Sequence, residues 1–187
     1  LGIFAALHRK GIKKGDRVAI LSNSRPEWCM TDMAIQCFGA VTVPIYQSNT
    51  PEDVGLILQD SGSSMVFAED ANQGAKLKEV FTQTGTVLPV IFFNPETRVE
   101  GVESEKFASL FPVKDREKWV AEMRASVEAI APEDLASLVY TSGTTGKPKG
   151  VVRDNGGHAV VLWNSMKMIY GVDAGEVWWT ASDVGWV

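Results

Sequence analysis

Short apolar runs, separated by stretches of helical pattern, constrain the fold of this chain more than any other feature. The runs occupy residues 17–21, 40–45, 64–68 and 88–93, and they are almost continuously apolar. Strands of that pattern are buried on both faces, as in parallel sheets that helices cover. Because helical stretches lie between the runs, the pattern predicts an α/β fold with a doubly wound, mostly parallel sheet.

The expected helices have recognisable beginnings. Thr50 can cap free amide groups, Pro51 fits a first helical turn, and Glu52 and Asp53 suit the positive end of the helix dipole. In the first half of the chain, helices are expected at about residues 26–38, 50–60 and 72–82.

The second half of the chain begins with a polar, irregular segment at residues 94–109, which we expect to be a long surface excursion. A helix is expected over residues 115–130, followed by a strand at 135–140. Four apolar side chains share one stripe of that helix and predict its core-facing side: Trp119, Met123, Val127 and Ile130.

Composition narrows the classes of function. The chain is 45% hydrophobic and 22% charged, which is typical of a soluble globular protein. Its net charge of -5 argues against a broad nucleic-acid-binding surface, because such surfaces need many cations. No stretch approaches the roughly 20 apolar residues that span a bilayer, so no transmembrane segment is predicted and a cytoplasmic location is the default expectation.

The two cysteines exclude a disulfide scaffold. Cys29 and Cys37 are eight positions apart, a spacing that fits neither a metal-binding nor a redox CxxC pair. We expect both to be buried thiols.

Both ends of the chain read as interior sequence. Residues 1–7 resemble the middle of an apolar helix that lacks its cap, and residues 184–187 stop within an apolar run. We therefore expect residues 1–187 to be one part of a larger domain, accompanied by the remainder of the same polypeptide.

A loop rich in glycine and hydroxyl groups follows directly after the strand expected at residues 135–140. It runs Thr141-Ser142-Gly143-Thr144-Thr145-Gly146-Lys147-Pro148-Lys149-Gly150. Glycine lets the backbone turn tightly and bring amide hydrogens to a phosphate, and the short hydroxyls can bond phosphate oxygens or hold a magnesium ion. The lysines supply positive charge where pyrophosphate charge develops. Since residues 135–153 contain no acid, the pattern predicts a local anion site.

This loop differs from that of P-loop kinases and GTPases. Thr141 stands where their first glycine would be, and Pro148 stands where Ser or Thr would follow the lysine. A flexible linker is the other interpretation, and the expected buried strand before the loop argues against it.

The run from Tyr140 to Gly150 closely resembles the signature of the adenylate-forming (AMP-binding) superfamily, which includes acyl-CoA synthetases, luciferases and adenylation domains of peptide synthetases. The resemblance implies that a carboxylic acid and ATP give acyl-adenylate and pyrophosphate, and that coenzyme A then takes the acyl group as a thioester. It implies ATP, Mg²⁺ and coenzyme A as the cofactors and co-substrates, and a truncated large N-terminal domain as the fold.

The same resemblance assigns residues. Lys149 and Thr145 are the expected catalytic residues, and Thr141 is the expected contact to nucleotide-bound magnesium. The expected phosphate-binding residues are Thr141, Ser142, Gly143, Thr144, Thr145, Gly146, Lys147 and Lys149.

The two parts of the chain resemble different branches of the superfamily. Residues 1–150 are similar to medium- and long-chain acyl-CoA synthetases, and residues 151–187 to acetyl- and propionyl-CoA synthetases. Either one branch mixes both patterns or two genes were joined. Trp186 and Val187 are expected to border the acyl group, with core packing as the alternative. His158 is a candidate for the nucleotide site, although a lone histidine is more often a surface or packed residue.

Later elements that the superfamily uses for adenine, ribose and the adenylation lysine have no counterpart in this chain, and neither has the C-terminal domain. We therefore expect a fragment of a carboxylate-CoA ligase that is inactive alone. Two alternatives stay open: another adenylate-forming enzyme, of the carrier-protein-loading or luciferase-like kind, and a non-enzymatic nucleotide-binding module.

Overall fold

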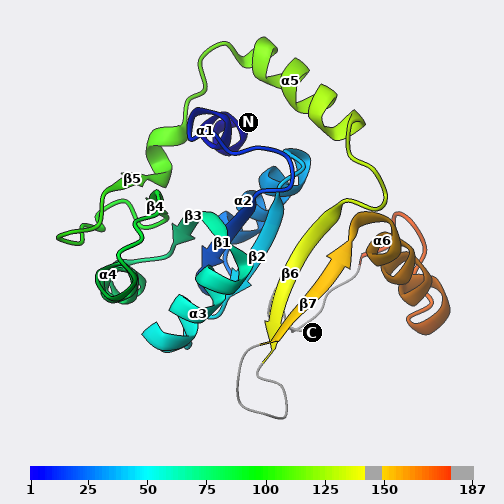
Figure 1. Ribbon diagram of the computed structural model, residues 1–187. Helices are drawn as coiled ribbons and strands as arrows, with labels where there is room; N and C mark the ends of the chain where they lie inside the picture. Colours follow the sequence, from blue (N-terminus) through cyan, green and yellow to red (C-terminus); the bar gives the residue numbers. More distant parts are fainter. Residues whose placement is uncertain (142–148, 178–187) are drawn as a thin grey trace.

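The computed structural model describes residues 1–141 and 149–177. Its strands are β1 (Arg17–Leu21), β2 (Val41–Ile45), β3 (Ser63–Ala68), β4 (Val90–Phe92), β5 (Ser104–Lys106), β6 (Leu135–Thr141) and β7 (Lys149–Asp154). They form one sheet in the order β5-β4-β3-β1-β2-β6-β7 (Figure 1). All neighbours pair in parallel except β6 and β7, which are antiparallel. The predicted α/β fold with a mostly parallel sheet is therefore confirmed.

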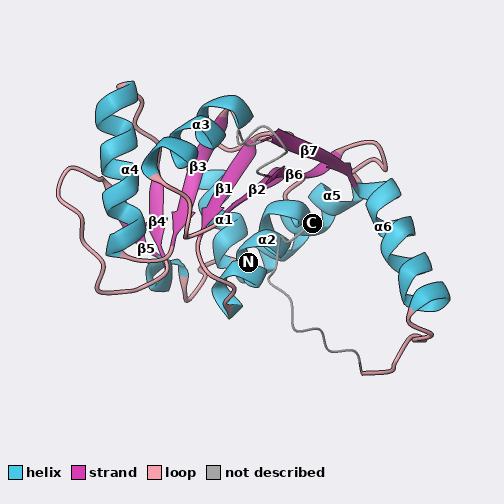
Figure 2. Cartoon of the chain, turned by 90° about the horizontal axis from the view of Figure 1, so that it is seen from below, coloured by secondary structure: helices cyan, strands magenta, loops and turns pink. Residues whose placement is uncertain are grey.

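Helices cover both faces of the sheet (Figure 2). The α-helices are α1 (Gly2–Arg9), α2 (Pro26–Cys37), α3 (Pro51–Ser61), α4 (Ala71–Thr84), α5 (Arg116–Glu128) and α6 (Asn155–Asn164). Val18 and Ile20 of β1 face the core with α1 and α2, whereas Ala19 and Leu21 face the core with α3 and α4. Each such fully buried aliphatic side chain contributes roughly 1.5–3 kcal/mol, so β1 is stabilised on both faces.

Both ends of α3 are fixed by specific hydrogen bonds. The Thr50 hydroxyl accepts a bond from the Asp53 amide, and the Asp53 carboxylate accepts one from the Thr50 amide, each at 3.2 Å. The helix ends at Gly62, whose φ of +60° suits glycine. Arg17 of β1 donates to the carbonyl oxygens of Ser61 at 2.7 Å and Gly62 at 3.0 Å. The last turn of α3 is thereby tied to the central strand.

The segment at residues 94–109 is more ordered than predicted. It contains β5, which pairs with β4 through Val90 and Ser104, and it is followed by a short 3-10 helix (Phe107–Leu110) whose Phe107 and Leu110 are buried. Residues 94–103 form no helix or strand and are mostly exposed, as expected of a surface excursion. The expectation was wrong for residues 104–109, because the polar strand Ser-Glu-Lys carries no apolar pattern and is held by backbone pairing.

Helix α5 packs along only part of its predicted stripe. Trp119 and Met123 are half-buried against the core beside α1, and the Trp119 ring meets the ring of His8 at 5.4 Å. Val127, in contrast, is 45% exposed, so its assignment to the core was wrong. The helix begins beside α1 (Figure 1), and near its end the Ser126 hydroxyl donates to the Phe38 carbonyl at 3.0 Å.

The prediction of two buried thiols was also wrong. Cys29 is exposed and Cys37 is half-buried. Helix α2 turns other residues inward, namely Trp28, Thr31 and Ile35. Since Cys29 directly follows Trp28, its side chain lies off the buried face.

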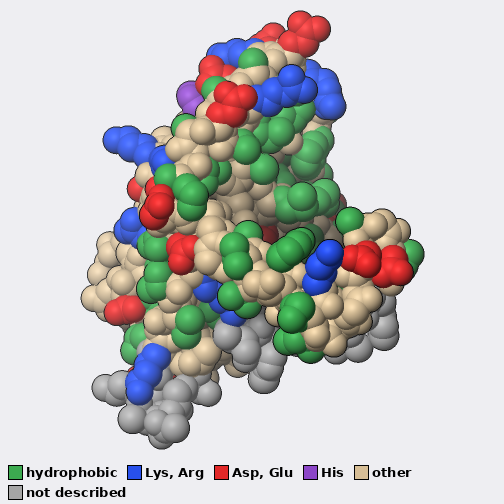
Figure 3. Space-filling view, turned by 90° about the vertical axis from the view of Figure 1, so that its right-hand side faces the viewer, with side chains coloured by type: hydrophobic (Ala, Val, Ile, Leu, Met, Phe, Trp, Pro, Cys, Tyr) green, Lys and Arg blue, Asp and Glu red, His purple; other side chains and the backbone are tan. Residues whose placement is uncertain are grey.

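An apolar surface lies along α6. Hydrophobic side chains gather on the side of the molecule shown in Figure 3. In α6 and the π-helical turn after it (Ser165–Ile169), seven large side chains are more than half exposed: Val160, Val161, Leu162, Trp163, Met168, Ile169 and Tyr170. We call this set the α6 surface.

Candidate functional site

The predicted anion site is flanked in sequence by two paired strands. Strands β6 and β7 pair antiparallel from Leu135 opposite Asp154 to Thr141 opposite Lys149. Residues 142–148 connect them. The sequence pattern predicted the strand before the loop and gave no sign of β7, so the loop lies between two paired strands. Its two flanking residues are fixed in register by the ladder.

Thr141 and Lys149 lie on the same face of this hairpin. They are direct partners in the ladder, and side chains of directly opposite residues in an antiparallel pair leave it on one face. Lys149 is exposed and Thr141 is half-buried. A hydroxyl and an ammonium group are thus presented together at the entrance of the loop, which fits the binding of a phosphate.

Tyr140 holds the other face of the hairpin. Its side chain is 8% exposed and belongs to the core with α3 and α4. Its hydroxyl donates to Oδ2 of Asp60 in the last turn of α3, at 2.7 Å. Burial raises the pKa of the Tyr140 hydroxyl, and the bond to Asp60 raises it further, so the hydroxyl stays protonated and remains a donor.

Gly150 allows this arrangement. It lies opposite Tyr140 in the ladder, and a Cβ added to it would lie 3.3 Å from Cζ of the Tyr140 ring. The ring therefore rests against bare backbone. The glycine after the two lysines has a packing reason, in addition to any role in the loop.

Most of the predicted site residues lie outside the described residues. They are Ser142, Gly143, Thr144, Thr145, Gly146 and Lys147 of the loop, and Trp186 and Val187 near the end. The structure brings together Thr141 and Lys149, the two that it describes.

The start of α6 is anchored to the segment that precedes β6. Asp154 caps the helix by accepting from the Gly157 amide, and the Asn155 amide donates to the Asp134 carbonyl at 3.0 Å. The Gly156 amide donates to the Pro132 carbonyl at 2.8 Å. A Cβ on Gly156 would lie 2.8 Å from Cβ of Pro132, so only glycine fits there without movement.

His158 lies on α6, as expected, and is half-buried. Burial lowers its pKa, and the charge of Arg153 lowers it further, against the opposing effects of Asp154 and Asp32. Its charged neighbours therefore include Asp32 of α2 as well as two residues of β7. The loop residues 142–148 lie outside the described residues, so the assignment of His158 to the nucleotide site stays a prediction.

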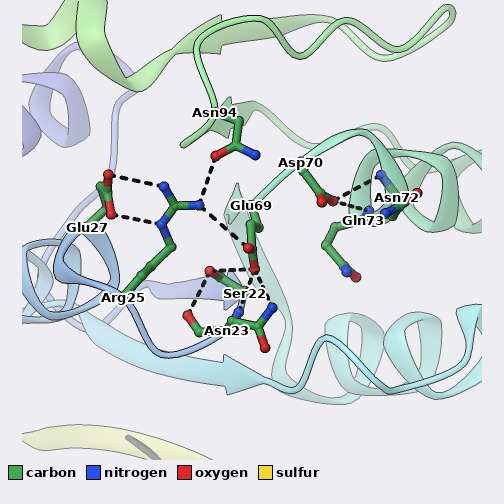
Figure 4. Close-up of polar contacts among 9 residues, drawn as sticks. All are labelled: Ser22, Asn23, Arg25, Glu27, Glu69, Asp70, Asn72, Gln73 and Asn94. Carbon is green, nitrogen blue, oxygen red and sulfur yellow. Dashed lines mark hydrogen bonds and ion pairs between the residues drawn. The ribbon is translucent and has the colours of Figure 1, made fainter.

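A second polar cluster lies at the carboxyl ends of β1, β3 and β4 (Figure 4). Glu69 accepts hydrogen bonds from the Asn23 amide at 2.7 Å, from the Asn23 side chain at 3.0 Å and from the Ser22 hydroxyl at 3.3 Å. Arg25 lies 3.6 Å from the other oxygen of Glu69 and donates to Asn94 Oδ1 at 2.9 Å.

Arg25 also pairs with Glu27 at 2.8 and 3.1 Å and stacks over Phe93 at 5.5 Å. The hydrogen bond between them raises the pKa of Arg25 and lowers that of Glu27. Arg25 thereby ties the start of α2 to the residues that follow β3 and β4. No local sequence pattern indicates Glu69 or Asn94 as its partners.

This cluster occupies the place where doubly wound sheets often bind ligands. The winding reverses at β1, since α2 crosses one face and α3 the other, and ligands commonly lie at the carboxyl ends beside such a point. Here Asn23 and Arg25 both bind Glu69, so the polar groups of this cluster already have partners within the protein. The β6–β7 hairpin is therefore the stronger candidate site.

Magnesium has few protein ligands available in the described part of the chain. Residues 1–141 and 149–177 contain no group of three His, Cys, Asp or Glu side chains that could hold a metal ion. A magnesium ion that bridges phosphates needs only one or two protein oxygens. The Thr141 hydroxyl at the loop entrance fits that smaller requirement. In the same described ranges, no helix has the length and apolarity needed to cross a membrane.

Comparison with known proteins finds relatives that match most of this chain. The chain is 36% identical over 190 residues to an uncharacterised protein of Pseudomonas aeruginosa, which covers 97% of this chain and 30% of that protein. It is 40% identical over 143 residues to a long-chain-fatty-acid–CoA ligase of Mycobacterium bovis, over 75% of this chain and 22% of the ligase. It is 30% identical over 188 residues to the acetyl-coenzyme A synthetase of Parvibaculum lavamentivorans, over 97% of this chain and 29% of the synthetase. The chain thus spans less than a third of each relative.

A solved structure has the same fold. The luciferase-like enzyme from the nonluminescent mealworm Zophobas morio superposes with a TM-score of 0.69 at 18% identity, over 88% of this chain and 36% of that enzyme. The family model described as AMP-binding enzyme matches residues 4–187. With the hairpin loop and these relatives, the chain belongs to the AMP-binding enzymes, the adenylate-forming superfamily that includes the acyl-CoA synthetases.

Proposed function

We propose that this chain supplies the phosphate-binding part of an ATP-dependent carboxylate-CoA ligase. The observation that carries the proposal is the register of the hairpin, which sets Thr141 opposite Lys149 at the two ends of the glycine- and hydroxyl-rich loop. Both relatives with a named activity are ligases that join an acid to coenzyme A.

The proposed reaction has two steps. A carboxylate oxygen attacks the α-phosphorus of ATP, the bond from that phosphorus to the bridging oxygen breaks, and acyl-adenylate and pyrophosphate form. The thiol of coenzyme A then attacks the acyl carbon, and AMP leaves with the oxygen that linked it to the acyl group. Negative charge on the departing pyrophosphate grows during the first step.

The loop is assigned to that growing charge. Lys149 would meet the pyrophosphate with its ammonium group, while Thr141, Ser142, Thr144 and Thr145 would donate hydroxyl hydrogens. Thr141 would hold Mg²⁺, which would supply positive charge that neutralises the phosphates. A strand position that is fixed in register favours Lys149 as the catalytic lysine, since a preorganised charge costs little reorganisation at the moment of reaction.

The acid is proposed to be an aliphatic carboxylate, and its chain length is left open between the long-chain and acetyl classes that the relatives represent. Trp186 and Val187 are assigned to the border of its pocket. Coenzyme A is the proposed acceptor, because both named relatives use it. We also propose a cytoplasmic location, since the proposed reaction consumes ATP and coenzyme A.

A hybrid enzyme tests this proposal. In it, this chain replaces the matching segment of the Parvibaculum lavamentivorans synthetase, so the only phosphate loop present is that of residues 141–149. We expect carboxylate-dependent exchange of labelled pyrophosphate into ATP, with the unmodified synthetase as the positive control. A hybrid that melts cooperatively yet gives no exchange would contradict the proposal.

A further inference from the structure

We infer that Asp60 is a positioning residue for Thr141 and Lys149, acting through Tyr140. This inference rests on the proposed function of the loop and deepens it. Asp60 lies in α3, far from the loop in sequence, and its Oδ2 accepts the hydrogen bond of the Tyr140 hydroxyl at 2.7 Å. Tyr140 directly precedes Thr141, where the chain enters the loop.

The anchor that Asp60 provides is itself fixed. It sits in the last turn of α3, which Arg17 binds through the carbonyl oxygens of Ser61 and Gly62. The hydroxyls of Ser61 and Ser63 bond each other at 2.7 Å in a buried position. The path from the central strand β1 to the base of the hairpin therefore consists of short, specific contacts.

Asp60 is placed against the preferences of its own helix. A carboxylate in the last turn of a helix faces the negative end of the dipole, and aspartate is a poor helix former. The acids at the first turn of α3, Glu52 and Asp53, are in contrast well placed. Local helix energetics do not account for an aspartate at position 60, whereas the bond to Tyr140 does.

The hairpin side of the contact is equally specific. Tyr140 is buried in the core with α3 and α4, and its ring lies against Gly150, the residue after Lys149. One side chain thus touches both strands, one residue away from each end of the loop. A hydrogen bond that fixes the Tyr140 ring also fixes the backbone that presents Thr141 and Lys149.

Elsewhere in the described chain, the pocket between α3 and α4, about 220 Å³ and lined by residues such as Leu58, Val80 and Phe81, carries no comparable assignment because nothing indicates its occupant. The Asp60–Tyr140 contact, in contrast, is a specific hydrogen bond, and Tyr140 directly precedes a residue of the proposed phosphate site.

Hydrogen exchange of this chain tests the contact without relying on activity. In Asp60→Ala and in Tyr140→Phe, the amides of β7 should exchange about tenfold faster, as expected for loss of one charge-assisted hydrogen bond. The double variant should exchange no faster than either single variant. Asp60→Asn, which keeps an acceptor oxygen, should restore much of the protection, and Gln59→Ala in the same helical turn should leave it unchanged.

Two outcomes would contradict the claim that Asp60 holds the hairpin through Tyr140. One is unchanged exchange of β7 in Asp60→Ala. The other is equal acceleration in β1 and β3, which would mark a general loss of stability.

Kinetics in the hybrid enzyme test the positioning role. Asp60→Ala should lower kcat for pyrophosphate exchange about tenfold and leave KM for ATP within a few-fold, because Thr141 and Lys149 would be held less firmly toward the reacting phosphates. Asp60→Asn should recover most of kcat. If β7 is loosened and kcat is unchanged, the positioning role is wrong. If the hybrid with the native chain is inactive, the proposed function fails, and hydrogen exchange still decides whether Asp60 holds the hairpin.

Discussion

Lys149 lies directly opposite Thr141 across the β6–β7 ladder, so the two residues that flank loop 142–148 leave the hairpin on the same face. The position of the lysine backbone is therefore set by strand pairing, which a free glycine-rich segment would not provide. This relationship connects the fold to the proposed chemistry, because a cation held by a strand can be preorganised for a departing phosphate.

Replacing either of two helical glycines by alanine should change the stability of the chain, in opposite directions. A Cβ on Gly55 of α3 would lie 3.5 Å from the methyl groups of Val80, an ordinary contact. Gly55→Ala should therefore raise the free energy of unfolding by roughly 0.5–1 kcal/mol, since alanine is the better helix former.

A Cβ on Gly74 of α4 would lie 2.5 Å from a methyl carbon of Val99 and 2.7 Å from Cζ of Phe92. Gly74→Ala should lower the free energy of unfolding by roughly 1–3 kcal/mol, because the core would be overpacked. Urea denaturation of the two variants measures both effects. Equal changes in the two would show that the helices do not pack as described.

The pairing of Arg25 with Glu27 predicts a specific loss of stability in acid. The hydrogen bond from Arg25 lowers the pKa of Glu27 below its ordinary value of 4.5. A carboxyl whose pKa is lowered on folding stabilises the native state above that ordinary value, and the contribution disappears as pH falls through the lowered value. Glu27→Gln should therefore be less stable than the native chain at neutral pH, with the difference shrinking below pH 4.5.

Thermal denaturation between pH 7 and pH 2 measures this difference. In the background of Arg25→Ala, Glu27→Gln should have little remaining effect. A difference that stays constant with pH would contradict the assignment of the pair.

The α6 surface predicts self-association of this chain. Val161 is 60% exposed and Trp163 is 62% exposed, within a contiguous set of large apolar side chains. Val161→Glu should shift the chain toward monomer in sedimentation and reduce its binding of a dye for apolar surface. Ala121→Glu on the exposed side of α5 serves as the matched control. A native chain that is monomeric and binds no dye would contradict this prediction.

The parallel part of the fold could be predicted from the sequence for a physical reason. Residues such as Val18, Ile20 and Leu21 are buried on both faces of β1, so their strand appears as a continuous apolar run. The start of α3 could be predicted equally well, since Thr50 and Asp53 form the reciprocal cap that a threonine followed by an acidic residue suggests. In both cases the deciding interactions are local, or depend only on burial.

Elements that depend on distant partners could not be predicted in this way. Strand β5 is polar and β7 has only two apolar residues, and both strands form because β4 and β6 offer them an edge. Val127 fits the apolar stripe of α5, yet it is 45% exposed, and the helix is held at that turn by the bond from Ser126 to the Phe38 carbonyl instead. Within the candidate site, the sequence indicated Thr141 and Lys149, whereas Asp60 is recognisable only once the structure brings it to Tyr140.

The isolated chain is predicted to be inactive. Positioning of two substrates contributes roughly 7–11 kcal/mol at best to lowering a reaction barrier, and this chain spans less than a third of its relatives' length. No carboxylate-dependent pyrophosphate exchange is expected from residues 1–187 alone under conditions in which the hybrid is active. Exchange at a rate typical of an enzyme would show that the chain is sufficient.

The action of Lys149 on the departing pyrophosphate can be measured by alanine substitution in the hybrid enzyme at saturating acid. Because the charge it meets is greatest as pyrophosphate leaves, Lys149→Ala should lower kcat for pyrophosphate exchange by about 10²-fold, while KM for ATP stays within a few-fold. Lys147→Ala is the matched control and should lower kcat by a smaller factor. Native kcat in Lys149→Ala, or a rise confined to KM for ATP, would show that the lysine does not act on the leaving group.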